Sequence, residues 1–127
     1  MLVPRMMVSS AYGSTNIESV TAVTSRPMSC ADSWQITVSW VIHNPNNTLY
    51  SLTLTKELPI PQTVVLSNQT CASGNHVFDT GLYGDTTGSS NTTEYKFQVR
   101  LVQRSNSAVV QSVDSNSEIE QWTACPP

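Results

Sequence analysis

The sequence predicts an all-β protein, a seven-stranded antiparallel β-sandwich. Three observations support this prediction: short segments alternate apolar and polar residues, turn-forming residues separate these segments, and no segment has the periodicity of a long helix. The chain of 127 residues has the size of one domain, large enough for a core that is stable without metals. We expect the sandwich to span residues 16–123, preceded by an extended arm (1–15) and followed by a short tail (124–127).

The first three strands are predicted at residues 16–24, 33–42 and 48–55. The second is the clearest, because its apolar side chains recur at every other position and so share one face of the strand. Turn chemistry at 43–47, with Asn and Pro, separates it from the third. The residues expected to point inward from the second and third strands are Trp34, Ile36, Val38, Trp40, Tyr50, Leu52 and Leu54.

The last four strands are predicted at 63–66, 75–82, 93–104 and 108–113. The first of these follows the proline-rich segment 58–61 and is expected at a sheet edge, since proline cannot donate to a ladder. The strand at 93–104 has the most regular alternation in the chain. Its predicted inward residues are Tyr95, Phe97, Val99 and Leu101.

Two segments resemble the fibronectin type III family. Thr80-Gly-Leu82, a crossing loop and then Tyr95-Lys-Phe97 is similar to the corner before the sixth strand of that family, and Val38-Ser-Trp40 is similar to its second strand. The resemblance covers roughly residues 16–122 and implies an immunoglobulin-like sandwich. It also implies that Trp40, Tyr95 and Leu82 belong to the core, with the Tyr95 hydroxyl bonded to the connecting loop. The sequence departs from the family in a longer loop between Leu82 and Tyr95, and in Asp79, where an apolar residue is expected.

The composition indicates an extracellular protein, either secreted or on a cell surface. Charged residues make up only 12% of the chain, the net charge is −3, and Ser, Thr and Asn supply most of the polarity. A nucleic-acid-binding protein would carry a clustered basic face, and no apolar run has the length of a membrane span. We therefore expect neither a nucleic-acid partner nor a membrane span.

Three Asn-x-Ser/Thr triplets are candidate sites for N-linked glycans. They begin at Asn46, Asn68 and Asn91, and a chain so rich in these residues contains roughly two by chance. Their number is therefore uninformative. We expect all three in loops, where a glycan projects into solvent.

The three cysteines, Cys30, Cys71 and Cys125, suggest an oxidising compartment rather than a zinc site, because no CxxC pair is present. The type III resemblance implies that Cys30 and Cys125 lie at the same pole of the sandwich and form a disulfide. It places Cys71 at the opposite pole, so Cys71 is expected to be a free thiol or to form a bridge to another chain.

No catalytic or metal-binding pattern occurs in the sequence. His43 and His76 lack partners at ligand or triad spacing, and the aspartates at 79, 85 and 114 fit no calcium loop. We expect no enzyme activity and no cofactor. Only Tyr83 and Trp122 could offer an aromatic surface to a carbohydrate, which makes sugar binding a weak interpretation.

The arm suggests self-assembly. It contains the apolar residues Leu2, Val3, Met6, Met7 and Val8, which have no place in a seven-strand core. We expect a structural or adhesive subunit that forms a homopolymer, with the arm docking on the edge strand 63–66 of the next copy and Cys71 near that contact. The alternative is a receptor or cell-adhesion ectodomain fragment, or a viral surface domain, that binds another extracellular protein through loops 43–47 and 104–107.

Overall fold

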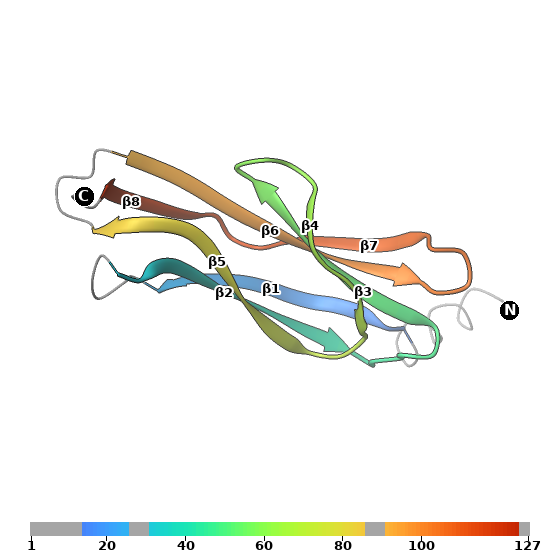
Figure 1. Cartoon of the computed structure of the whole chain (residues 1–127). Coiled ribbons are helices and arrows are strands. Elements are labelled where there is room, and N and C mark those ends of the chain that lie inside the picture. Colours follow the sequence, from blue (N-terminus) through green and yellow to red (C-terminus); the bar gives the residue numbers. More distant parts are fainter. Residues whose placement is uncertain (1–13, 26–30, 86–90, 125–127) are drawn as a thin grey trace, which may run out of the picture.

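The structure is a computed structural model that describes residues 14–25, 31–85 and 91–124; within them it contains eight β-strands and no helix (Figure 1). The strands are β1 (Asn16–Ser25), β2 (Ser33–His43), β3 (Tyr50–Leu58), β4 (Thr63–Thr70), β5 (Gly74–Asp85), β6 (Asn91–Gln103), β7 (Val109–Asp114) and β8 (Glu118–Ala124).

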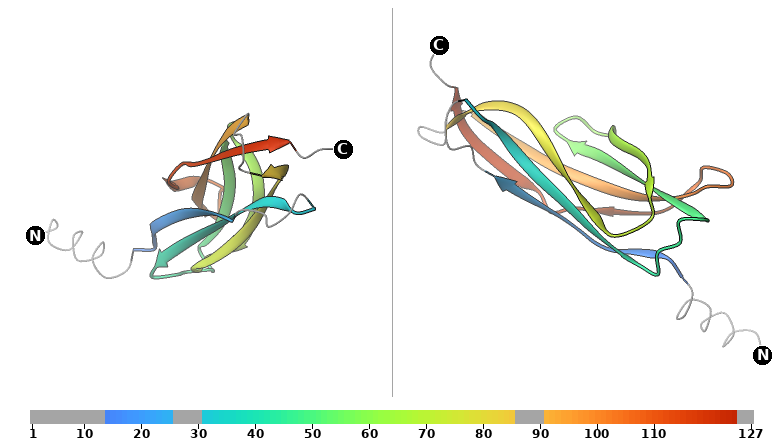
Figure 2. Two further views of the ribbon diagram at one scale, coloured as in Figure 1. Left: turned by 90° about the vertical axis from the view of Figure 1, so that its left-hand side faces the viewer. Right: turned by 60° about the horizontal axis from the view of Figure 1, so that its bottom comes forward.

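Two antiparallel sheets pack face to face as a sandwich (Figure 2). One sheet has the order β1-β2-β5, and the other has the order β4-β3-β6 with β7 and β8 both paired to the far side of β6. β7 pairs with the C-terminal half of β6 and β8 with its N-terminal half. At one end β8 also pairs with the last residues of β5, which joins the two sheets there.

The core lies between β2, β3 and β6, and it confirms the alternation that the sequence predicts. Trp34, Ile36, Val38 and Trp40 of β2 are buried, as are Tyr95, Phe97, Val99 and Leu101 of β6. Phe78 of β5 packs against Phe97, with 5.3 Å between the two ring centroids. Each large apolar side chain buried in this way stabilises the fold by about 1.5–3 kcal/mol.

The strand count and several strand boundaries differ from the prediction. The seventh predicted strand ends at Asp114, and after three residues the chain continues as β8, an eighth strand. β4 extends to Thr70, so Asn68 lies in a strand, and Asn91 is the first residue of β6. Placing all three glycan acceptors in loops was therefore wrong: only Asn46 lies outside a strand.

Several predicted features fall outside the described residues. These are the apolar arm residues Leu2, Val3, Met6, Met7 and Val8, and the two cysteines of the expected disulfide, Cys30 and Cys125. Both the arm's docking and the disulfide remain predictions.

Candidate functional site

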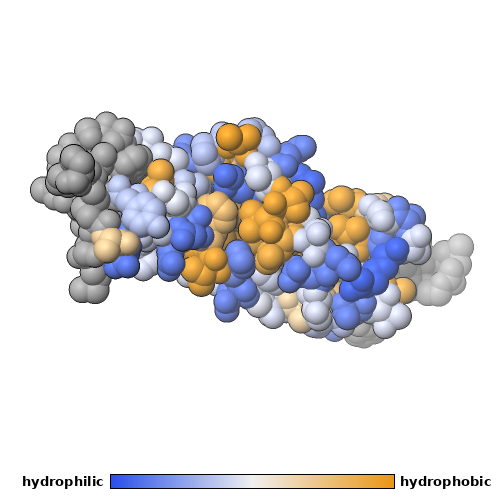
Figure 3. Space-filling model, in the orientation of Figure 1, coloured by the Kyte–Doolittle hydropathy of each residue, from blue (hydrophilic) through white to orange (hydrophobic). Residues whose placement is uncertain are grey.

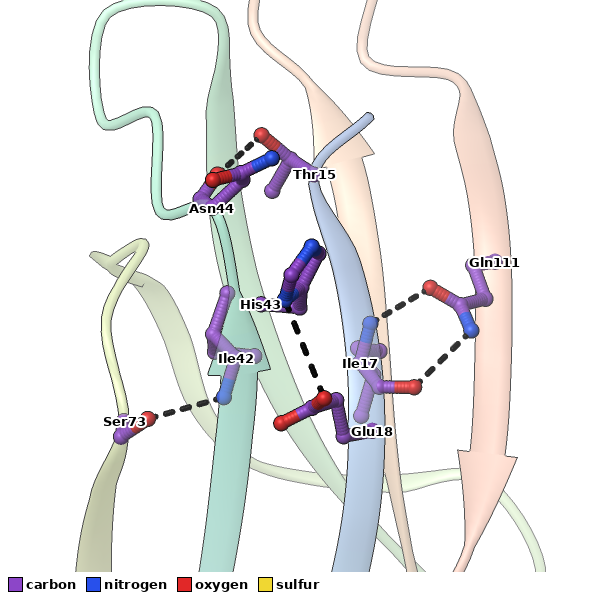
Figure 4. Close-up of polar contacts among 8 residues, drawn as sticks. All are labelled: Thr15, Ile17, Glu18, Ile42, His43, Asn44, Ser73 and Gln111. Atoms are coloured by element: carbon purple, nitrogen blue, oxygen red, sulfur yellow. Dashed lines mark hydrogen bonds and ion pairs between the residues drawn. The ribbon is translucent and has the colours of Figure 1, made fainter. Parts of the chain in front are cut away.

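The edge strand β1 lies beside β7 and β8 of the opposite sheet, and side chains rather than a backbone ladder join them. Figure 4 shows the contact with β7. Gln111 of β7 accepts a hydrogen bond from the Ile17 N–H through Oε1 (2.7 Å) and donates one to the Ile17 carbonyl through Nε2 (3.2 Å). Asn116 repeats this arrangement on Ala22, at 2.9 and 3.0 Å. Each carboxamide thus takes the place that the N–H and C=O of one residue in an antiparallel neighbouring strand would occupy.

A carboxylate extends the same contact. Glu118 Oε1 accepts a hydrogen bond from the Thr24 N–H at 2.8 Å. We call Gln111, Asn116 and Glu118 the side-chain seam. Because it occupies three N–H groups and two carbonyls of β1, it leaves fewer backbone groups on this edge for another strand to pair with.

A bulge between β7 and β8 directs Asn116 toward β1. Ser115 is buried, its N–H donates to the Phe97 carbonyl (2.7 Å), and its Oγ accepts from the Phe97 N–H (2.9 Å). The serine hydroxyl therefore replaces a ladder carbonyl while the chain bends. Bulges commonly re-aim a neighbouring side chain in this manner.

The opposite edge strand, β4, is open. Among the described residues it pairs only with β3, through a register broken at two points. Ile60, just before it, and Val64, within it, are 66% and 58% exposed. A strand edge with free backbone groups and exposed apolar side chains can accept another strand.

Arg104 holds the end of β4 against the turn between β2 and β3. Its Nε donates to the carbonyls of Asn47 (2.7 Å) and Tyr50 (3.1 Å), Nη1 donates to Asn68 Oδ1 (2.9 Å) and Nη2 to Asn47 Oδ1 (2.8 Å). Asn47 Oδ1 also accepts from the Cys71 N–H at 3.0 Å. Arg104 begins the loop 104–107 that the alternative function assigns to ligand binding, and its guanidinium is bonded within the chain.

The outer faces of the two sheets carry different side chains. On the five-stranded sheet, Asp114 lies 3.4 Å from Lys96 and accepts from Gln98, whose Oε1 accepts from Arg100. On the three-stranded sheet, Val23, Thr37 and Val77 form one cross-strand row with exposed valines. Figure 3 shows the apolar side chains of one face gathered in patches separated by polar ones.

Glu120 of β8 is the one buried charged residue among those whose exposure the structure describes. It is 0% exposed, and neither of its carboxylate oxygens has a hydrogen-bond partner. Burial, and next the charge of Glu118, raises the pKa of Glu120 to about 7. Burial, followed by the charge of Glu120, also raises the pKa of Tyr95, against a hydrogen bond with Thr80. The Glu120 carboxyl group can therefore hold a proton at neutral pH inside the fold.

The predicted core residues lie where the sequence placed them. Trp40 is buried and its Nε1 donates to the Ala72 carbonyl at 2.9 Å, Tyr95 is buried, and Leu82 is half-buried against the core. Cys71 is a free thiol only 1% exposed. A bridge from this position to another chain would require the surrounding core to open, which favours the free-thiol alternative.

Asn46 and Asn68, the two glycan acceptors whose exposure the structure describes, differ in their surroundings. Asn68 is exposed on β4, whereas Asn46 is half-buried and its Oδ1 accepts from the N–H groups of Thr48 and Leu49. A glycan attaches through Nδ2, so both carbonyl contacts are compatible with modification.

The titratable residues singled out in the sequence are dispersed. His43 is half-exposed and 3.8 Å from Glu18 (Figure 4). Asp79 is exposed, and hydrogen bonds from Ser33 and then Gly81 hold its pKa below the usual value. Across residues 14–25, 31–85 and 91–124, no group of three or more His, Cys, Asp or Glu side chains is arranged to hold a metal ion.

In the same part of the chain, no helix has the length and apolar character needed to cross a membrane. No protein-family model, curated protein or solved structure matches the sequence or the fold.

Proposed function

We propose that this protein is a fibronectin type III-like extracellular module of structural or adhesive type. Its copies self-assemble when a strand of one copy adds to the β4 edge of another. The open edge of β4, opposite a β1 edge that side chains close, is the observation that carries the proposal.

The strand order supports the type III-like class. β4 pairs with β3 and lies in the sheet of β6, whereas immunoglobulin constant domains place their fourth strand beside the fifth. Trp40, buried in the centre of β2, agrees with the resemblance of that segment. The Tyr95 hydroxyl, which the resemblance places against the connecting loop, instead shares a hydrogen bond with Thr80 within β5.

The arm of a neighbouring copy is the strand that we propose to occupy β4. Thirteen residues precede Ser14, and an extended segment of that length reaches roughly 45 Å. β4 has eight residues, which span about 27 Å, so the arm can pair along the whole of β4. Thr15 is tied to the sandwich itself, since its hydroxyl donates to the Asn44 carbonyl (Figure 4).

An extracellular setting is part of the proposal. The low charge content and the abundance of Ser, Thr and Asn favour it, and exposed Asn68 offers an acceptor for an N-linked glycan. A glycan there would lie near the Arg104 end of β4, away from Val64.

Light scattering coupled to size-exclusion chromatography, over a series of concentrations, tests assembly. We expect the mass of the wild type to rise with concentration above the 13.9 kDa of one chain. Deletion of residues 1–13 and the substitution Val64→Lys should each leave a folded monomer, because one removes the donor strand and the other places a charge on the acceptor edge.

Val23→Lys is the matched control. Val23 is an equally exposed valine (63%) on the other outermost strand, and this variant should assemble like the wild type. The proposal fails if the wild type stays monomeric, if assembly survives deletion of the arm, or if both lysine variants behave alike.

A further inference from the structure

β8 is the strand whose burial runs against its hydrophobic pattern. Ile119 is 61% exposed, whereas its neighbour Glu120 is 0% exposed. The register with β6 explains this: Ile119 is opposite exposed Glu94, and Glu120 is opposite Thr93 on the inner face. Since a strand's side chains alternate between faces, a position that buries Glu120 must expose Ile119.

Among the described residues, none with a positive charge is a cause of the shift in the pKa of Glu120, and its carboxylate oxygens have no hydrogen-bond partner. On its own strand the nearest acid is Glu118, whose Oε1 is already bonded to the Thr24 N–H of β1. On β6, the charge of Glu120 acts on the phenol of Tyr95 and helps to raise the pKa of Tyr95. A buried carboxylate that lacks a hydrogen bond and a counter-charge is unfavourable, so the closed fold favours the protonated form.

Other charged groups on the packed strands lie elsewhere. On β6, Glu94 is exposed and Lys96 pairs with Asp114 of β7. On β5, exposed Asp79 bonds to Ser33 on the outer face, and Asp85 pairs through the backbone with Thr123 of β8.

β8 also ties the two sheets together. It pairs with β6 at five positions, and with β5 at only two, Gly84 with Ala124 and Asp85 with Thr123. Loss of β8 would therefore separate the sheets at this end while leaving the ladders of β2, β3 and β7 in place.

We propose that β8 is a pH-dependent closing strand, which packs against β6 and β5 while Glu120 is protonated and detaches when this carboxyl group gives its proton to solvent. The inference is independent of assembly at β4.

The direction of the pH dependence follows from proton binding. The pKa of Glu120 is raised from 4.5 to about 7 in the closed fold, so the closed form holds more protons than the open form between these values. Closure is then fully stable below about pH 4.5, weakens as pH rises, and levels off above about pH 7. The equilibrium constant for opening should grow on the order of a hundredfold between about pH 5 and pH 8.

Hydrogen exchange read by mass spectrometry, peptide by peptide, tests the proposal on the full chain. The measured exchange rate of each peptide is divided by its intrinsic exchange rate at the same pH. We expect protection of the peptide covering β8 to fall on the order of a hundredfold from about pH 5 to pH 8 relative to the β2 peptide. Equal pH dependence of both peptides would overturn the proposal.

Two substitutions remove the ionisable group. Glu120→Gln and Glu120→Leu should each make β8 protection nearly independent of pH, and the apolar variant covers the case in which a buried amide disturbs folding. Glu94→Gln, on the exposed outer face, is the matched control and should keep the wild-type profile. The proposal is wrong if the Glu120 variants keep the wild-type profile. It is also wrong if millimolar CaCl₂ restores β8 protection at pH 8, because β8 would then close with Glu120 deprotonated.

Discussion

The two outermost strands of this sandwich, β1 and β4, differ in how their outer edges are hydrogen-bonded. β1 has three of its backbone N–H groups, those of Ile17, Ala22 and Thr24, bonded to side chains from the other sheet. β4 has a backbone partner on one side only, within the described residues, and exposes Val64. The two strands are of similar length, ten and eight residues, so length does not explain the difference.

The comparison shows that an edge can be closed without another strand. A carboxamide presents an N–H donor and a carbonyl acceptor on the same side, as the N–H and C=O of one strand residue do, and Gln111 and Asn116 use both. β4 relies on weaker protection: its broken register with β3 and the prolines at 59 and 61 discourage a regular ladder. This is why we place assembly at β4 rather than at β1.

Breaking the side-chain seam should have the largest effect on stability. The double variant Gln111→Ala, Asn116→Ala removes four hydrogen bonds and leaves backbone groups of Ile17 and Ala22 unpaired. We expect a loss of about 3 kcal/mol in the free energy of unfolding, at about 0.5–1.5 kcal/mol for each bond. Urea denaturation measures it.

The control for this variant removes two amides that make only local bonds. Gln69 donates to the Ser67 carbonyl and Asn106 accepts from the Ala108 N–H. The double variant Gln69→Ala, Asn106→Ala should cost less than about 1 kcal/mol. A similar loss of unfolding free energy in both double variants would show that the side-chain seam contributes no more to stability than local hydrogen bonds do.

The sandwich was predictable because β2 and β6 are central strands. Each has one face on the core, so apolar residues recur at every second position, and burial follows the alternation from Trp34 to Trp40 and from Tyr95 to Leu101. The resemblance at Trp40 and Tyr95 rested on the same residues.

The seam and β8 could not be predicted, for two physical reasons. The seam joins Gln111, Asn116 and Glu118 to residues 94 positions earlier in the chain, and no local pattern marks a side chain that bonds to a distant backbone. β8 buries Glu120 and exposes Ile119, so a hydrophobic pattern assigns its faces in reverse. Its register is set by the backbone ladder with β6.

Removing the bulge hydroxyl should have an intermediate effect. In Ser115→Ala the Phe97 N–H loses its acceptor within the core, where an unsatisfied donor costs about 1–3 kcal/mol. We expect a loss of about 2 kcal/mol by urea denaturation, whereas Ser112→Ala, at an exposed position of β7, should change little.

A double-mutant cycle sharpens this result. If Ser115 directs Asn116 toward β1, Ser115→Ala and Asn116→Ala should be coupled by at least about 0.5 kcal/mol. Strict additivity of the two losses would separate the bulge from the seam.

The smallest of the three effects is expected where Arg104 holds the end of the open edge. Arg104→Lys keeps the charge but loses the fork that reaches Asn47, Tyr50 and Asn68 at once. Because the guanidinium is exposed, we expect a loss of only about 1 kcal/mol, with faster amide exchange confined to the Asn68 end of β4. Arg104→Gln should behave in the same way, since geometry rather than charge makes these bonds. A lysine variant as stable as the wild type, beside a destabilised glutamine variant, would show instead that the positive charge holds this end of β4.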